Sequence, residues 1–137
     1  MSAAPSTAND EELIALALAA REKAYAPYSH FSVGAAVRAR DGRTFAGANV
    51  ENASYGLSTC AERSAVAAAA SAGARELEAV AVATGASPPS SPCGACRQIL
   101  AEFGREMRVL LVNDRGERIA TTLGELLPRA FRGDELP

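Results

Sequence analysis

The residues from Cys60 to Asn113 read CAERSAVAAAASAGARELEAVAVATGASPPSSPCGACRQILAEFGREMRVLLVN, and this stretch decides the fold. Two helix patterns alternate in it with two short apolar strand patterns, over residues 60–72, 77–84, 94–103 and 107–113. Gly73 follows the first helix, where a C-terminal glycine is favoured. Prolines and serines at 85–92 exclude regular structure between the first strand and the second helix. Helices that alternate with buried strands predict an α/β fold.

The residues before this stretch add one helix. Leucines and alanines recur at helical spacing and predict an amphipathic helix over 10–24. Asn9 is the expected N-cap, with Glu12 three residues later, and Pro27 stops the pattern.

A hairpin and a last short strand complete the predicted sheet. Asp41-Gly42 is a two-residue turn signal between strand patterns at 32–39 and 44–48. A turn at 114–117 precedes a short strand near Ile119. The prediction is a three-layer α-β-α sandwich around a mixed sheet of about five strands.

Length and composition predict one domain over residues 1–137, with flexible ends at 1–8 and 132–137. The first residues have no basic start or long apolar run that resembles a secretory signal. The alanine-rich run at 65–72 is far shorter than the roughly 20 apolar residues of a membrane span. We therefore expect a soluble, cytoplasmic chain with no membrane partner. A formal net charge of −2 offers no broad attraction to phosphates, so a nucleic acid polymer is not the expected substrate.

The three cysteines raise the question of metal chemistry. Cys93-Gly94-Ala95-Cys96 has the two-residue spacer that lets both thiolates reach one zinc ion, although a redox disulfide is an alternative. Cys60, at the start of a predicted helix, supplies a third thiol and favours the metal. Three protein ligands leave one position for water, as in catalytic zinc sites, unless His30 closes the site as a fourth ligand.

Residues beside Cys60 suit hydrolytic chemistry. Water bound to zinc supplies hydroxide near neutral pH, and Glu62 is placed to move its proton. Arg63 and two helix N-termini offset the negative charge of three thiolates. Arg97 and Gln98 are weaker candidates for that role.

Two segments resemble the zinc-binding segments of the small homotetrameric cytidine deaminases: Cys60-Ala61-Glu62-Arg63 and the run from Pro92 to Gln98. The resemblance continues through four more blocks, at 25–31, 33–36, 49–56 and 125–131. It implies that Cys60, Cys93 and Cys96 bind Zn²⁺. Glu62 then moves protons between the water, ring N3 and the departing amine.

The same resemblance implies hydrolysis of free cytidine and deoxycytidine to uridine, deoxyuridine and ammonia, in pyrimidine salvage. Asn49 and Glu51 are then the pair that hydrogen-bonds a ribose hydroxyl. The other implied contacts are a base wall at Phe31, a backbone amide at Ala61, site and subunit support at Tyr55, and a reach into a neighbouring subunit at Phe131. The expected assembly is a homotetramer with shared active sites.

Three other functions remain open at this point. Aminonucleoside-antibiotic deaminases of the blasticidin S type resemble the chain in the zinc segments and around 125–128, but the 49–55 block looks like the cytidine type. A deoxycytidylate deaminase needs phosphate contacts, and the sequence shows no glycine-rich phosphate cradle. The third alternative is a noncatalytic, zinc-stabilised binding module, and the presence of Glu62 argues against it because such a module would not require this residue.

Overall fold

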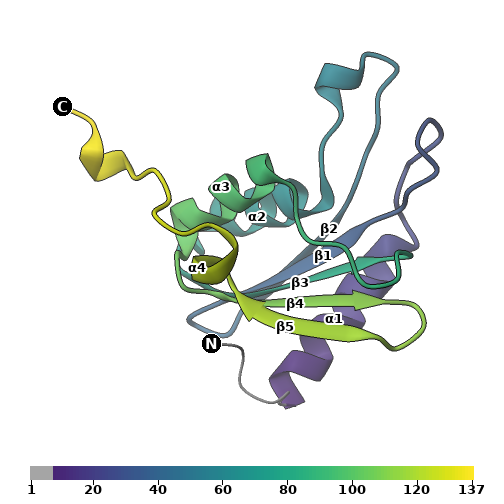
Figure 1. The fold of residues 1–137 in the computed structure, drawn as a ribbon, viewed down its shortest axis with the longest axis horizontal. Coiled ribbons are helices and arrows are strands. Elements are labelled where there is room, and N and C mark those ends of the chain that lie inside the picture. The colour runs from purple at the N-terminus through teal and green to yellow at the C-terminus, as the bar shows by residue number, and fades with distance from the viewer. Residues whose placement is uncertain (1–7) are drawn as a thin grey trace.

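The computed structural model of the protein describes residues 8–137, and a five-stranded sheet lies at its centre in the order β2-β1-β3-β4-β5 (Figure 1). The strands are β1 (Gly34–Ala39), β2 (Thr44–Ala48), β3 (Leu77–Thr84), β4 (Arg108–Asn113) and β5 (Arg118–Thr122). β3 and β4 are parallel, and the other neighbouring strands are antiparallel. The predicted mixed sheet is confirmed.

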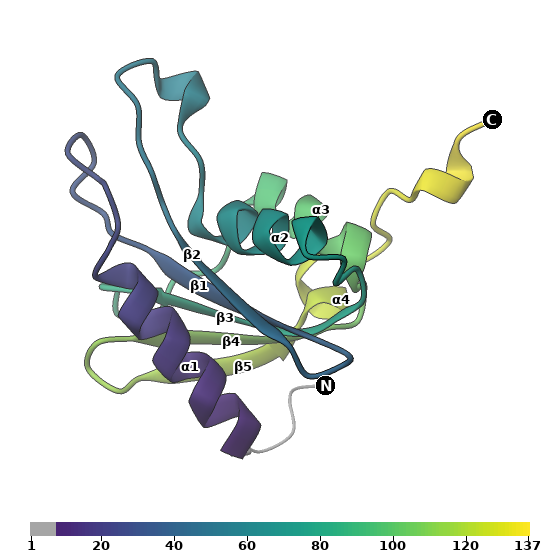
Figure 2. The ribbon, with the colours of Figure 1, turned by 180° about the vertical axis from the view of Figure 1, so that it is seen from behind.

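Helices cover both faces of this sheet. α1 (Ala8–Arg21) lies across one face, and α2 (Ala61–Ser71) and α3 (Gly94–Phe103) lie on the other (Figures 1 and 2). A short α4 (Leu123–Leu126) follows β5. The three-layer sandwich is therefore also confirmed. Within residues 8–137, no helix has the length and apolar character that crossing a membrane requires.

The alternation of side chains along β3 explains why the sheet carries two cores. Ala79, Ala81 and Ala83 face α1 and pack with Leu13 and Ala17. Val80 and Val82 face the opposite way and pack with α2 and α3. Small residues toward α1 and larger ones toward α2 and α3 let the helices on both faces approach this central strand, which is buried on both sides.

Two glycines permit the closest helix contacts. A Cβ atom on Gly34 would lie 2.1 Å from the Ala17 carbonyl oxygen of α1. A Cβ atom on Gly47 would lie 2.6 Å from the Ser64 Cβ atom of α2. Both helices thus lie directly on the backbone of the hairpin strands. The contact between Gly47 and Ser64 sets the distance of α2 from the sheet, and the first turn of α2 carries part of the candidate site.

Several predicted boundaries are wrong, with local causes. α1 starts at Ala8, so Asn9 is inside its first turn and is not the N-cap; its carbonyl oxygen accepts a hydrogen bond from Arg38. α1 ends three residues early, because the chain leaves through tight turns and Tyr25 then pairs with Val50. α2 starts at Ala61 and ends at Ser71, inside the expected 60–72.

Strand ends and turns differ by similar amounts. β1 starts at Gly34 and not at 32, and β4 starts at Arg108 and not at 107. The hairpin turn has three residues, because Ala39 N–H bonds the Arg43 carbonyl and Gly42 adopts a φ of +97°. The expected flexible start over 1–8 lies outside the described residues except for Ala8, which begins α1.

Candidate functional site

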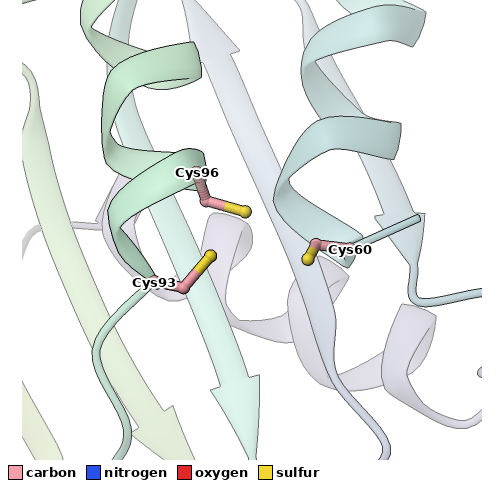
Figure 3. A group of neighbouring side chains, drawn as sticks. All are labelled: Cys60, Cys93 and Cys96. Carbon is pink, nitrogen blue, oxygen red and sulfur yellow. The ribbon is translucent and has the colours of Figure 1, made fainter. Parts of the chain in front are cut away.

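The three cysteines meet where α2 and α3 begin. Cys60 is the N-cap of α2, Cys93 is the N-cap of α3, and Cys96 lies in the first turn of α3. Their Sγ atoms all lie within 4.8 Å of one another (Figure 3). Three thiolates bound to one zinc ion lie about 3.8 Å apart, since a Zn–S bond is about 2.3 Å. The cluster therefore fits a tetrahedral zinc ion.

The electrostatics of the cluster favour a bound cation. Burial raises the pKa of the Cys60 and Cys96 thiols. The backbone N–H of Cys96 lowers the pKa of the Cys93 thiol. Both helix N-termini direct their dipoles at this point, which stabilises negative charge. Thiolates this close repel one another strongly unless a divalent cation lies between them.

The alternatives for the cysteines are not supported. All three cysteines are free, so Cys93 and Cys96 form no disulfide. His30 is exposed, and the residues in 8–137 close enough together to hold a metal are the three cysteines alone. The closed Cys/His site is thus wrong for this structure. A three-cysteine site keeps a fourth coordination position for water, as catalytic zinc sites do.

A pocket of about 270 Å³ opens beside the cluster. It contains seven of the residues predicted from the sequence: Phe31, Asn49, Glu51, Cys60, Ala61, Glu62 and Cys93. Six further lining residues were not predicted: Ser29, Val33, Val82, Thr84, Ser90 and Ser91. Cys96 is fully buried behind this surface. The pocket gives a small molecule access to the open side of the cluster.

Glu62 is the buried carboxyl group of the pocket. It follows Cys60 by two residues in the first turn of α2, and its side chain is only 5% exposed. Desolvation raises its pKa above the ordinary value for glutamate. A carboxyl group in this setting can both accept and donate a proton near neutral pH.

Asn49 and Glu51 are the polar side chains of another part of the pocket lining. Asn49 Oδ1 accepts from Val33 N–H at 2.9 Å, and its Nδ2 donates to the Phe31 carbonyl at 2.9 Å. Glu51 Oε1 accepts from the backbone N–H groups of Tyr28 and Ser29 at 3.0 and 3.1 Å. The two side chains thus fix the segment that carries Phe31, a function that the sequence did not indicate.

The remaining predicted residues lie at different distances from the pocket. Ala61 lines it, and the amides of the first turn of a helix have no intrahelical acceptor. Tyr55 is 74% exposed, stacks edge-on with Tyr28 at 5.8 Å, and lines a second pocket next to the first. Phe131 and Arg63 are exposed and line neither pocket.

Arg97 and Gln98 hold the C-terminal segment, not the cysteine sulfurs. Arg97 donates to the Pro92 and Leu126 carbonyls, and Gln98 donates to the Phe131 carbonyl. The bonds to Leu126 and Phe131 join α3 to the chain after β5. Three of the unpredicted lining residues are serines, and each lies close to a segment that the sequence analysis singled out. Ser90 and Ser91 directly precede Pro92-Cys93, and Ser29 lies in the segment 25–31 that resembles the cytidine deaminases.

An open three-thiol site, a buried carboxyl group and a small pocket are the parts that a zinc-dependent hydrolase requires, and this α/β sandwich places the chain in that class. The chain matches the cytidine and deoxycytidylate deaminase zinc-binding region over residues 7–112. It is 49% identical to a cytidine deaminase of Sporosarcina psychrophila, over 92% of this chain and 93% of that protein.

Solved structures agree with this match. Cytidine deaminase from Burkholderia pseudomallei is 51% identical, with a TM-score of 0.86 over 92% of this chain and 100% of that one. Cytidine deaminase from Mycobacterium tuberculosis is 44% identical, with a TM-score of 0.75 over 88% of this chain and 95% of that one. The chain belongs to the cytidine deaminase family, and its metal is Zn²⁺.

Proposed function

We propose that the protein hydrolyses free cytidine and deoxycytidine to uridine and deoxyuridine, with release of ammonia. The observation that carries this proposal is the pocket that joins the three-cysteine cluster, the buried Glu62 and the Asn49–Glu51 pair. Relatives named cytidine deaminase, 49% identical over nearly the whole chain, support the same reaction.

The catalytic roles follow from position. Cys60, Cys93 and Cys96 hold Zn²⁺, which when bound makes a water molecule acidic enough to attack near neutral pH. Glu62 takes one proton from the attacking water and delivers it to ring N3; it then takes the second proton from the new C4 hydroxyl and gives it to the departing amine, which leaves as ammonia. Arg63, in the first turn of α2, offsets the negative charge of the three thiolates.

Hydrogen-bonding capacity supports a sugar hydroxyl as the ligand of Asn49 and Glu51. The Asn49 amide keeps one donor and one acceptor position after its bonds to Phe31 and Val33. Glu51 keeps about one of the roughly four acceptor positions of a carboxylate, because Tyr28 and Ser29 occupy three. A hydroxyl that donates to Glu51 and accepts from Asn49 matches what remains.

The base lies toward the cysteines in this proposal. Phe31, 42% exposed and in the pocket wall, packs against one face of the pyrimidine. The Ala61 backbone N–H donates to the pyrimidine carbonyl oxygen. These contacts place C4 and its amine toward Glu62 and the metal.

We propose a homotetramer with shared active sites as the active assembly. The support is aromatic surface near the pocket mouth and in the C-terminal segment, where Tyr55 and Phe131 are 74% and 56% exposed. The segment that carries Phe131 projects away from the body of the chain (Figures 1 and 2). Tyr55 supports the site at a subunit contact, and Phe131 reaches the pocket of a neighbour.

The cellular setting belongs to the same proposal. We propose a single domain over residues 1–137, with a flexible tail at 132–137, that acts in the cytoplasm in pyrimidine salvage. Free nucleosides as substrates are consistent with that role, and the family match over 7–112 covers most of the domain.

The test is ammonia release from cytidine, deoxycytidine, cytosine and blasticidin S by zinc-loaded protein, with Glu62→Gln as the control. Turnover of both nucleosides, absent from the control, is the expected result. Activity on blasticidin S alone would instead make the protein an antibiotic deaminase. Release from none of the four compounds would favour a noncatalytic binding module.

A further inference from the structure

Ser29 connects two parts of the pocket wall that have separate tasks in the proposed function. Its Oγ donates to Glu51 Oε2 and accepts from the Phe31 N–H at 3.0 Å. The segments 22–33 and 49–60, which carry these residues, project together at one end of the molecule (Figures 1 and 2). One hydroxyl thus joins the sugar-binding carboxylate to the backbone of the residue whose ring lines the base site.

The position of Ser29 shows why this bond matters for binding. Ser29 and Glu51 line both the main pocket and the second pocket beside it, so they form the wall between the two. Glu51 is half-buried, and the backbone N–H groups of Tyr28 and Ser29 hold its Oε1 atom. Without the Ser29 hydroxyl, the Oε2 side of the carboxylate would be held less firmly, and ordering a side chain on ligand binding costs about 0.5–1.5 kcal/mol.

The direction of each hydrogen bond leaves Ser29 only one arrangement. A hydroxyl has one proton, and here the Phe31 N–H occupies one of its lone pairs while the proton points to Glu51. Hydrogen bonds to a carboxylate are shorter and stronger than those between neutral groups. The bond therefore fixes Oε2 and directs its remaining acceptor position.

We propose that Ser29 is a positioning residue for the nucleoside: it holds the Glu51 carboxylate ready for the sugar hydroxyl. This inference rests on the proposed function. Ser29 touches neither the reacting carbon nor the metal, so its effect belongs to substrate binding and to the choice of sugar.

The experiment compares Ser29→Ala with the parent on cytidine, 2′,3′-dideoxycytidine and 5′-deoxycytidine. Each analogue lacks a hydroxyl that cytidine and deoxycytidine share. Loss of one charge-assisted hydrogen bond predicts a KM for cytidine that rises about tenfold, with kcat within about twofold of the parent. On the analogue that lacks the hydroxyl bound by Glu51, the KM of Ser29→Ala should differ from that of the parent by less than about twofold, because the carboxylate then has no sugar hydroxyl to bind.

Matched variants separate positioning from general damage. Ser32→Ala, in the same segment, should keep the parental KM, and Ser29→Thr, which keeps a hydroxyl, should recover most of it. Adding Ser29→Ala to Glu51→Gln should raise KM little further, since both act through one carboxylate. Thermal midpoint and zinc content should match the parent in every variant.

Three results would overturn the inference: an unchanged KM in Ser29→Ala, an equal loss on cytidine and both analogues, or additive effects of Ser29→Ala and Glu51→Gln. A parent protein with no activity on any cytosine nucleoside would instead reject the proposed function. The two failures are therefore distinguishable.

Discussion

At the scale of single residues, Glu62 is set apart by its burial. It is 5% exposed in a pocket whose other acidic residue, Glu51, is held by backbone and hydroxyl donors. Burial next to the cysteine cluster suits Glu62 to the proposed exchange of protons with a bound water. The half-buried Glu51 carboxylate keeps an acceptor position for a hydroxyl group.

Substitution of Glu62 by glutamine should abolish turnover and leave the metal in place. Glutamine keeps the size of the side chain but cannot carry the proton, and loss of a general acid–base lowers kcat by about 10²–10⁴. Rates come from ammonia release and metal content from elemental analysis. Glu102→Gln, exposed on α3, is the matched control and should keep both. Near-parental turnover, or loss of zinc, in Glu62→Gln would contradict the assigned role.

Which site residues the sequence reveals depends on how far apart they lie. The two-residue spacer of Cys93 and Cys96 places both on one helix turn, so sequence alone predicts their meeting. The bonds of Glu51 with Tyr28 and Ser29 join residues more than twenty positions apart, and no local pattern encodes them. For that reason the role of the Asn49–Glu51 pair in holding the Phe31 segment appeared only in the structure.

At the scale of elements, buried strands and the helices around the cysteines were the most predictable. β3 and α3 have the predicted bounds because an apolar run and a helical stripe are local signals. The start of α1 was missed because tertiary partners decide it: Arg38 bonds the Asn9 carbonyl and Arg108 bonds the fully buried Asp10. α4 has four residues, which are too few to show a period.

The contact of α2 with β2 makes Gly47 a test of how elements position the site. Gly47→Ala forces a methyl group against Ser64 Cβ at 2.6 Å and Ala65 N at 2.7 Å, so α2 must shift. Overpacking of this kind costs about 1–3 kcal/mol. Because Cys60 and Glu62 begin α2, kcat should fall as well. Denaturant unfolding and steady-state rates measure the two effects.

Gly133→Ala is the control for that substitution, since a Cβ atom there meets nothing within 4 Å. It should leave both stability and kcat at the parental level. A Gly47→Ala protein with parental stability would mean that α2 can move outward without cost, and that the helix position is not fixed by this contact.

At the scale of the whole molecule, the metal joins two elements that are otherwise separate in sequence. The cysteine ligands lie at the N-terminal ends of α2 and α3, so a bound ion links the two helices that cover one face of the sheet. Removal of zinc by a chelator should lower the free energy of unfolding by about 2 kcal/mol or more, since a ligand that binds only the folded state stabilises it. In a chain of this length that loss corresponds to a fall of about 5 °C or more in Tm.

Calorimetry with and without chelator measures that shift, and re-addition of Zn²⁺ should reverse it. Cys93→Ser removes one ligand and should start from the lower Tm, with little response to added Zn²⁺. An unchanged Tm after removal of the metal, verified by elemental analysis, would mean that the cysteine cluster contributes to chemistry alone.

The proposed homotetramer leads to a separate prediction, because its shared active site needs Phe131 from a neighbouring chain. Phe131→Ala should then reduce kcat/KM by about tenfold or more, the usual loss when a central aromatic contact is removed. Leu136→Ala, 61% exposed in the same C-terminal segment, should have little effect. Sedimentation analysis reports the oligomeric state of each variant.

Mixing two impaired variants, Glu62→Gln and Phe131→Ala, shows which chain supplies the aromatic ring. Glu62→Gln subunits carry an intact Phe131, and Phe131→Ala subunits carry an intact Glu62. If Phe131 acts in a neighbour's pocket, hybrids formed by unfolding and refolding the mixture contain sites with both groups, and activity should return. If Phe131 serves the pocket of its own chain, no hybrid site is complete and the mixture should show only the residual activity of its components.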